Sequence, residues 1–311
     1  MESTPHLSPV LARVSVAAGL RHATVAGRDL HADNARELHR RLVNALYETF
    51  HSGHRPGETP APLVRDRAFE AELKAATPHT TTLAAAPRAG TGVVLVDGVR
   101  VRLPDAPASP GEPVRLPAHR PALSPGYFLV DGSRGRGAAR RPVLRVYVHV
   151  GDPAEAVRTW RAVTRALEDS AVPYRAKVLS ARPLYPRRDG LVVYLGPAAW
   201  RAAPLIVAAA PPARTNGPHP RTSAFARAVA PGVALAWEPE DDRPGYRGMS
   251  FGQHRATVIA DAVLAHAQER NPERTLHEHV SEQVRAAGIA PDAYYRNLHS
   301  PFPAALENLA R

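Results

Sequence analysis

Three side chains on two β-rich stretches have the types and spacing needed to move a proton beside an anion. His149 lies in the alternating stretch 143–150, and Arg175 and Lys177 lie in the stretch 174–179. Because side chains alternate across a strand, Arg175 and Lys177 share one face of theirs. If the two strands pair, an imidazole, an amine and a guanidinium group converge on one patch.

The same alternation places Arg145 and Tyr147 on the face of His149. Cations gathered in this way are costly unless an anion binds among them, and they disfavour the protonated form of an amine. An unprotonated amine can act as a general base, and an imidazolium can act as a general acid. The alternative is a solvated sheet face on which His149 is partly buried and Lys177 is an ordinary surface lysine. The residues alone leave both interpretations open.

Lysine usage favours the chemical interpretation. The chain has 40 basic residues, of which only Lys74 and Lys177 are lysines. A guanidinium group stays protonated and cannot act as a base. A lysine kept among so many arginines therefore suggests a position where a deprotonatable amine is needed; the alternative is that two lysines survive by chance.

The overall charge points to an acidic partner. The net charge is +11, which favours nucleic acid, a phosphorylated substrate or an acidic peptide. Aromatic residues make up only 6% of the chain, and no helix-turn-helix, RNP or zinc-finger spacing occurs. We therefore predict no nucleic-acid partner and favour a phosphorylated or acidic one.

Other motifs in the chain fit their usual chemistry poorly. Residues 248–252 match the Gly-x-Ser-x-Gly nucleophile elbow, but an acidic loop precedes them, so we interpret them as a turn before a helix. The glycine-rich stretch 132–137 lacks the Gly-Lys-Ser/Thr of a phosphate-binding loop and is interpreted as a flexible loop. His277 and His279 lack a third ligand at helical spacing, which predicts no metal site.

The elements that position these residues follow from periodicity and capping. The stretch 143–150 reads as a strand, Asp152-Pro153 opens a helix, 174–179 is a second strand, and a basic turn at 187–190 leads to a third strand at 191–195. This order predicts an α+β fold: a small mixed or antiparallel sheet with a strand-helix-strand core, flanked by helices.

The rest of the chain reads as further helices, one hairpin and irregular connections. We expect helices over 34–51 with Asn34 as cap, 69–76, 198–208, 253–269 and 275–287, a strand over 233–237, and a hairpin turning at Asp97-Gly98. The stretch 104–125 holds seven prolines and is expected to be extended and mobile. We divide the chain into a helical and irregular region, 1–88, and a catalytic domain, 89–311.

The expected cellular compartment of the protein follows from features that the sequence lacks. It has no cysteine, no apolar run long enough to cross a membrane, and no basic-then-apolar segment after Met1. We expect a soluble cytoplasmic protein with no membrane partner.

The motifs, taken in order, resemble known families. Val146-Tyr-Val-His149-Val, a helix, and then Tyr174-Arg-Ala-Lys177 resemble the core of phosphothreonine lyases secreted as type III effectors, in which a strand histidine precedes a Lys-x-Lys motif. The longer pattern over roughly 120–295 is similar to the HopA-type effector family. Its segments are Lys177-Val-Leu, Tyr185-Pro-Arg-Arg-Asp189, Val193-Tyr-Leu195, Ala230-Pro-Gly-Val-Ala and Ser250-Phe-Gly-Gln-His-Arg255. Members of that family serve as the lyase component of class V lanthipeptide and thioamitide biosynthesis.

This resemblance implies β-elimination of phosphate from phosphoserine or phosphothreonine, giving dehydroalanine or dehydrobutyrine. The base of the family falls on Lys177 and its general acid on His149, while Arg175 stands where the first lysine of Lys-x-Lys is expected and keeps its charge. The implied phosphate- or substrate-binding residues are Arg175, Arg188, Tyr194, Arg221, Arg227 and Arg255.

The implied reaction uses no metal or organic cofactor. Its substrate is a phosphorylated ribosomal precursor peptide, and a separate peptide kinase supplies it, because this chain has no phosphate-binding loop for ATP. The alternative from another class is a non-catalytic HopA-type protein that binds an acidic or phosphorylated partner.

Overall fold

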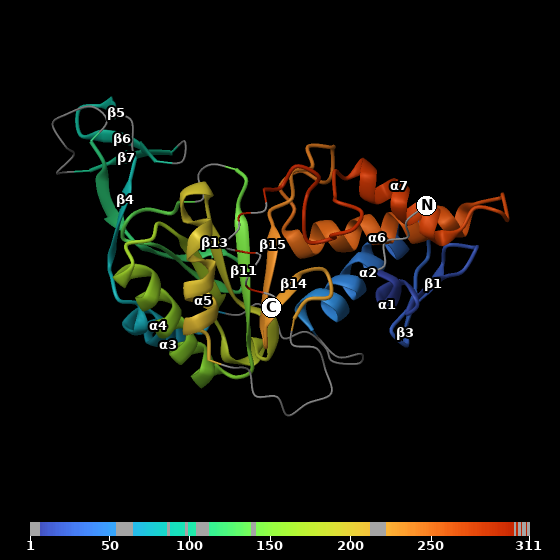
Figure 1. Cartoon of the computed structure of the whole chain (residues 1–311), viewed down its shortest axis with the longest axis horizontal. Helices are drawn as coiled ribbons and strands as arrows, with labels where there is room; N and C mark the ends of the chain where they lie inside the picture. Colours follow the sequence, from blue (N-terminus) through green and yellow to red (C-terminus); the bar gives the residue numbers. More distant parts are fainter. Residues whose placement is uncertain are drawn as a thin grey trace.

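A seven-stranded antiparallel sheet forms the centre of the protein (Figure 1). The computed structural model describes residues 7–53, 65–85, 88–96, 99–103, 112–137, 141–211 and 222–301, with Pro303, Leu306 and Leu309. The strands run in the order β14 (Arg227–Ala230), β15 (Val233–Trp237), β11 (Leu144–Val150), β13 (Arg187–Leu195), β12 (Arg175–Leu179), β10 (Tyr127–Asp131) and β9 (His119–Ser124). The predicted α+β class with an antiparallel sheet is confirmed.

Helices cover both faces of this sheet. One face packs on α3 (Arg67–Ala76), α4 (Pro153–Asp169) and α5 (Ala203–Ala209), with Trp160 at the centre of their shared core. The other face packs on α2 (Ala35–Leu46) and α6 (Phe251–Gln268) around Tyr147 and Phe251. Alternate residues of β11 enter the two cores, as period-two burial requires.

The strand-helix-strand unit is confirmed, but its two strands do not pair. Asp152 caps α4 through the backbone N–H of Glu155, at 2.7 Å, and α4 connects β11 to β12. β13 lies between β11 and β12 and is antiparallel to both. A helical crossover returns the chain parallel to the first strand, so the space between the two can accept a later antiparallel strand. The condition of direct pairing, on which the convergence of the three side chains depended, is therefore not met.

The basic turn predicted at 187–190 is also wrong, because β13 begins at Arg187 and includes these residues. The connection from β12 is instead the short 3-10 helix η3 (Arg182–Leu184) with the two residues after it. Asp189 is buried within the strand, where Arg187 forms two hydrogen bonds with its carboxylate, both 2.7 Å long. Because Arg187 and Asp189 pair with each other within the strand, this charged segment can lie inside the sheet although its sequence is typical of a turn.

The second half of the proline-rich stretch is extended, as expected, but it is paired into two sheets and is not a loose segment. β8 (Val114–Pro117) pairs with β4 (Thr81–Ala84), and β9 is the outermost strand of the central sheet beyond β10. Proline is tolerated in such a strand because its missing N–H falls on the side without a partner. Residues 104–111 lie outside the described residues.

The remaining predicted elements are confirmed at or near their expected bounds. Asn34 caps α2, which continues as the π-helix η2 (Tyr47–Ser52), and the stretch 198–208 divides into the 3-10 helix η4 (Pro197–Ala202) and α5. Ser250 caps α6, in keeping with a turn before a helix. The other elements are α1 (Ser8–Leu11), α7 (Leu276–Ala286), β1 (Val14–Val16), β2 (His22–Val25), β3 (Arg28–His31), β5 (Arg88–Gly90), and the hairpin β6 (Val93–Val96) with β7 (Val99–Arg102).

No helix within the described ranges has both the length and the apolar character to cross a bilayer. The division of the chain at residue 88 stays a prediction.

Candidate functional site

A cleft of about 440 Å³ brings together three of the residues that the sequence singled out, Arg175, Lys177 and Tyr194. The residues that line it are Leu123, Ser124, Leu129, Arg141, Val143, Arg175, Lys177, Tyr194 and Glu238.

Sheet register explains this convergence. Tyr194 on β13 lies directly opposite Arg175 on β12 and directly opposite Arg145 on β11. Lys177 lies in the next row on the same face, opposite Val192, which is opposite Tyr147. Directly opposed residues of antiparallel strands are close enough for their side chains to interact. The two rows therefore present cations and tyrosines side by side.

The Lys177 amine lies over aromatic rings. It is 4.0 Å from the ring centroid of Tyr127 on β10 and 6.0 Å from that of Tyr194. No carboxylate among the described residues is within ion-pair distance of this amine. The amine is half-buried at the cleft and in a position to meet a ligand there.

A buried carboxylate lies behind Tyr127. The Tyr127 hydroxyl donates to Asp189 Oδ2 at 3.0 Å, and the Tyr47 hydroxyl donates to the same oxygen at 3.2 Å. Burial alone would raise the pKa of Asp189, but the Arg187 guanidinium outweighs it and holds that pKa below its usual range. The carboxylate is therefore ionised, and burial raises the pKa of the Tyr127 hydroxyl well above its usual value.

His51 completes this buried cluster without charge. Its Nδ1 lies 2.8 Å from the Ser223 hydroxyl, and its Nε2 lies 3.9 Å from Asp189. Burial lowers the pKa of His51 to about 4, which keeps the ring neutral near pH 7. With 3% of its surface exposed, the ring is beyond the reach of a ligand in the cleft.

Arg175 is held in place by a carboxylate. Its Nε and Nη2 donate to the two oxygens of Asp131 at 2.6 and 3.0 Å, in a bidentate pair between directly opposed residues of β12 and β10. Asp131 is only 3% exposed. A bidentate pair fixes the plane of a guanidinium group, so Arg175 is oriented within the cleft rather than mobile.

Arg145 and Glu238 form the opposite wall. Arg145 is buried, hydrogen bonds to the Glu238 carboxylate and packs on the Tyr194 ring at 4.9 Å. Six cationic side chains and three carboxylates gather in and behind the cleft: Arg120, Arg141, Arg145, Arg175, Lys177 and Arg187, with Asp131, Asp189 and Glu238. The excess of positive charge favours an anionic ligand.

His149 lies on β11 beyond the position that is level with Lys177 on β12. The register of β11 against β13 shifts between Val148 and Val150, so His149 occupies a bulge, and its N–H donates to the Gly232 carbonyl at 2.7 Å. Tyr147, two residues earlier, is level with Lys177. A two-residue step along a strand is about 7 Å, so His149 and Lys177 are not direct neighbours.

Arg255 lies outside the cleft and is fully buried in α6. Its Nε donates to the Tyr294 carbonyl at 2.7 Å, its Nη1 donates to His254 Nδ1 at 2.8 Å, and its Nη2 donates to Asn297 Oδ1 at 3.2 Å. Burial lowers the pKa of Arg255 to about 10. The structure therefore makes it an anchor for the loop 287–300 and does not bring it to the cleft.

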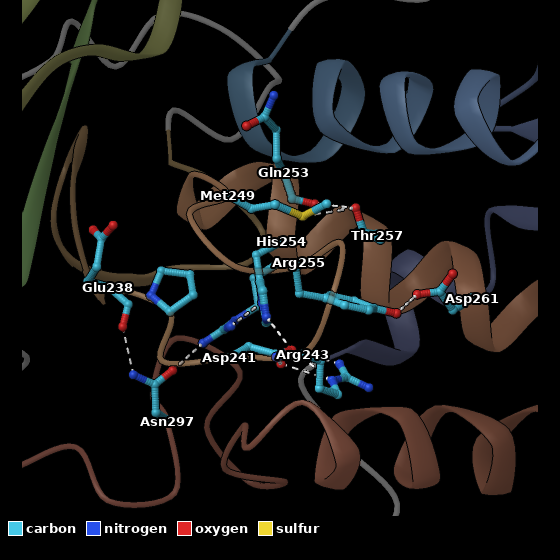
Figure 2. A network of polar contacts seen from close by, with 12 residues as sticks. Glu238, Asp241, Arg243, Met249, Gln253, His254, Arg255, Thr257, Asp261 and Asn297 are labelled. Atoms are coloured by element: carbon cyan, nitrogen blue, oxygen red, sulfur yellow. Dashed lines mark hydrogen bonds and ion pairs between the residues drawn. The ribbon is translucent and has the colours of Figure 1, made fainter. Parts of the chain in front are cut away.

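Figure 2 shows the polar contacts that extend from Arg255, through His254 to Asp241 on one side and through Asn297 to Glu238 on the other. Because Arg255 only donates, His254 Nδ1 must accept, and its Nε2–H then points to Asp241, 3.0 Å away. Burial, with the Arg255 charge, lowers the pKa of His254 to about 4. At the other end Asn297 donates to the Glu238 carbonyl at 2.7 Å, which supports one wall of the cleft.

The other predicted arginines lie elsewhere. Arg188 donates to the carbonyls of Thr49 and Phe50, at 3.0 and 3.3 Å, at the end of η2. Arg227 lies on the edge strand β14, four strands from β12 and so about 19 Å away, with its guanidinium 5.9 Å from the Tyr295 ring. Arg221 lies outside the described residues.

Sequence reasoning missed the carboxylates Asp131, Asp189 and Glu238 and the ring of Tyr127. Asp189 stands before a glycine and was assigned to a turn, and Tyr127 begins an apolar run that reads as core. The sequence signal that could have indicated Asp131 and Asp189 was an acidic residue next to a β-rich stretch in a strongly basic chain. Within the described ranges, no group of three or more histidine, aspartate or glutamate side chains is arranged to hold a metal ion.

The family model of the HopA1 effector protein family matches residues 118–296, more than half of the chain. The chain therefore belongs to the HopA1 effector protein family, as the resemblance predicted. The matched segment contains the whole cleft and the anchor of Arg255 up to Arg296.

Two solved structures are similar to this one. The effector protein from Pseudomonas syringae pv. tomato strain DC3000 is 16% identical, with a TM-score of 0.48, and the match covers 86% of this chain and 91% of that one. The effector protein from Pseudomonas syringae pv. syringae strain 61 is 16% identical, with a TM-score of 0.49, and the match covers 85% of this chain and 92% of that one. None of the curated proteins matches the chain.

Proposed function

We propose that this protein is a phosphoserine/phosphothreonine lyase that eliminates phosphate from a phosphorylated ribosomal precursor peptide in lanthipeptide-type or thioamitide maturation. The observation that carries the proposal is the Lys177 amine in a cationic cleft, with a fixed arginine, Arg175, directly beside it on β12. Family membership alone does not specify an activity, so the proposal rests on this chemistry.

In the proposed reaction the amine nitrogen of Lys177 accepts the α-proton of the phosphorylated residue. The electron pair of that C–H bond forms the Cα–Cβ double bond, and the Cβ–O bond breaks, releasing phosphate. The developing enolate and the departing dianion both need positive charge nearby, which Arg175 and the neighbouring arginines supply.

We assign the proton that the leaving phosphate takes up to His149. A base at Cα and an acid at the phosphate oxygen act at opposite ends of the reacting unit, so they need not touch. The bulge at His149 is in keeping with this role, because bulges re-aim side chains and occur beside active sites. A peptide substrate bound between His149 and Lys177 would span the distance of about 7 Å that separates them along the strand direction.

The second candidate is a non-catalytic protein of this family that binds an acidic or phosphorylated partner. The bidentate pair of Arg175 with Asp131 favours it, because it holds one guanidinium group rigidly in the cleft, where it can attract an anion without any reaction. Both candidates predict phosphopeptide binding, so turnover separates them.

Mass spectrometry of a phosphorylated peptide incubated with the purified protein tests the proposal. Elimination removes phosphoric acid and lowers the peptide mass by about 98 Da, whereas a phosphatase lowers it by about 80 Da and restores the hydroxyl. A peptide that binds and keeps its mass would favour the non-catalytic candidate, and a restored hydroxyl would rule out a lyase.

A further inference from the structure

We propose that Tyr127 is a positioning residue that holds the Lys177 amine in place, and that Asp189 in turn fixes Tyr127. The inference rests on the proposed function in that it names what orients the base. The geometry behind it does not depend on catalysis.

The contacts form a continuous chain from the cleft into the core. The amine lies 4.0 Å from the Tyr127 ring centroid, close enough for a cation–π interaction of the ammonium form and for an N–H···π contact of the neutral form. The ring cannot swing away from this position, because its hydroxyl donates to Asp189 Oδ2 at 3.0 Å. Asp189 is itself fixed by Arg187 through two hydrogen bonds of 2.7 Å.

Burial makes this support rigid. Tyr127 is 8% exposed and Asp189 is 4% exposed, and Tyr127 packs with Leu179 and Leu184 in a small core of its own. A lysine side chain has four rotatable bonds and loses considerable entropy when it is held in one geometry. No carboxylate of the described residues is paired to the amine, and the Tyr127 ring, at 4.0 Å, is the nearer of the two rings that localise it, the Tyr194 ring being 6.0 Å away.

The Lys177 side chain can be observed selectively by NMR, because Lys74 and Lys177 are the only lysines of the sequence. A protein carrying isotope-labelled lysine should give two ε-methylene signals in NMR spectra, and Lys74→Arg identifies the one from Lys177. We expect the Lys177 signal to be shifted upfield, because a group above a ring face lies in its shielding region. A Lys177 signal at the position of an unstructured lysine overturns the proposal without any variant of Tyr127.

Variants then separate the ring from its hydroxyl. Tyr127→Leu should remove most of the upfield shift and leave only the smaller contribution of the Tyr194 ring, Tyr127→Phe should leave a larger part of it, and Tyr185→Phe should leave it whole. Tyr185 is the matched control because its hydroxyl donates to the Leu179 carbonyl, at 2.8 Å, away from the amine. If Tyr127→Phe gives the full shift, the support from Asp189 is unnecessary and that part of the proposal fails.

Kinetics connect the geometry to elimination. Tyr127→Leu should lower kcat about tenfold or more, with KM changed less than about twofold, since the arginines that bind phosphate are untouched. Tyr127→Phe should restore part of the lost kcat. An increase in KM alone would contradict a positioning role. If the wild-type protein eliminates no phosphate, the proposed function fails while the NMR result still decides how Lys177 is held.

Discussion

At the scale of single residues, His149 and Arg175 have different roles in the proposed reaction. His149→Ala should slow elimination of phosphate by about 10²-fold or more and slow a substrate with a better leaving group less, because general-acid help grows with the charge on that group. Steady-state kinetics with the two substrates measure this. A raised KM with unchanged kcat for His149→Ala would remove it from the proton transfer.

Arg175 and Arg255 should separate binding from folding. Arg175→Ala should weaken binding of a phosphopeptide, and the loss should shrink as salt increases, because a screened charge-assisted contact has been removed.

Arg255→Ala leaves buried acceptors at Tyr294 and Asn297 and should lower the free energy of unfolding by about 3 kcal/mol. Binding isotherms and urea titrations check the pair, and a folded Arg255→Ala protein that has lost only binding would return Arg255 to the site.

At the scale of elements, the close packing of α6 on η2 depends on Gly252. A methyl group at Gly252 would lie 2.2 Å from Cδ2 of His51, which cannot retreat because it is enclosed in the core. Gly252→Ala should therefore destabilise the protein by about 1–3 kcal/mol through overpacking. Gly19→Ala is the control, since an added methyl there meets nothing within 4 Å. Equal melting temperatures for the two variants would contradict the packing described.

Local signals predicted most elements, and non-local ones were missed. The cap at Asp152, the alternation of β11 and the helix of Asn34 are each encoded within a few residues and were found. The insertion of β13 between β11 and β12 was not, because strand pairing depends on residues far apart in the chain. The same limit applies to the cleft: alternation put Arg175 and Lys177 on one face, whereas Asp131 and Tyr127 reach them only through the pairing of β10 with β12.

At the scale of the whole molecule, two buried neutral histidines make stability sensitive to acid. His51 and His254 have pKa values of about 4 in the fold, below the ordinary value of about 6.5 expected in the unfolded chain. Between these values the unfolded chain binds more protons, so acid favours unfolding. The stabilisation is complete above about pH 6.5 and is lost progressively as the pH falls from about 6.5 to about 4, below which both states are protonated.

The expected size of this effect is measurable. From about pH 7 to about pH 5 the two histidines together should cost about 3 kcal/mol of unfolding free energy. Urea titrations at both pH values measure the loss, and His254→Asn should reduce the pH dependence by roughly half. Stability that is constant over this range would mean that the two rings are not buried and neutral as described.

The central claim is that Lys177 removes a proton in an elimination, and Lys177→Arg tests it most directly. Arginine keeps the charge and the approximate reach but cannot take up a proton. One phosphopeptide, followed by binding and by mass spectrometry on the same sample, should bind the variant with a Kd within about threefold of wild type and yet show none of the loss of about 98 Da. Turnover of Lys177→Arg near the wild-type rate would contradict the account, because the base would then have to be another group.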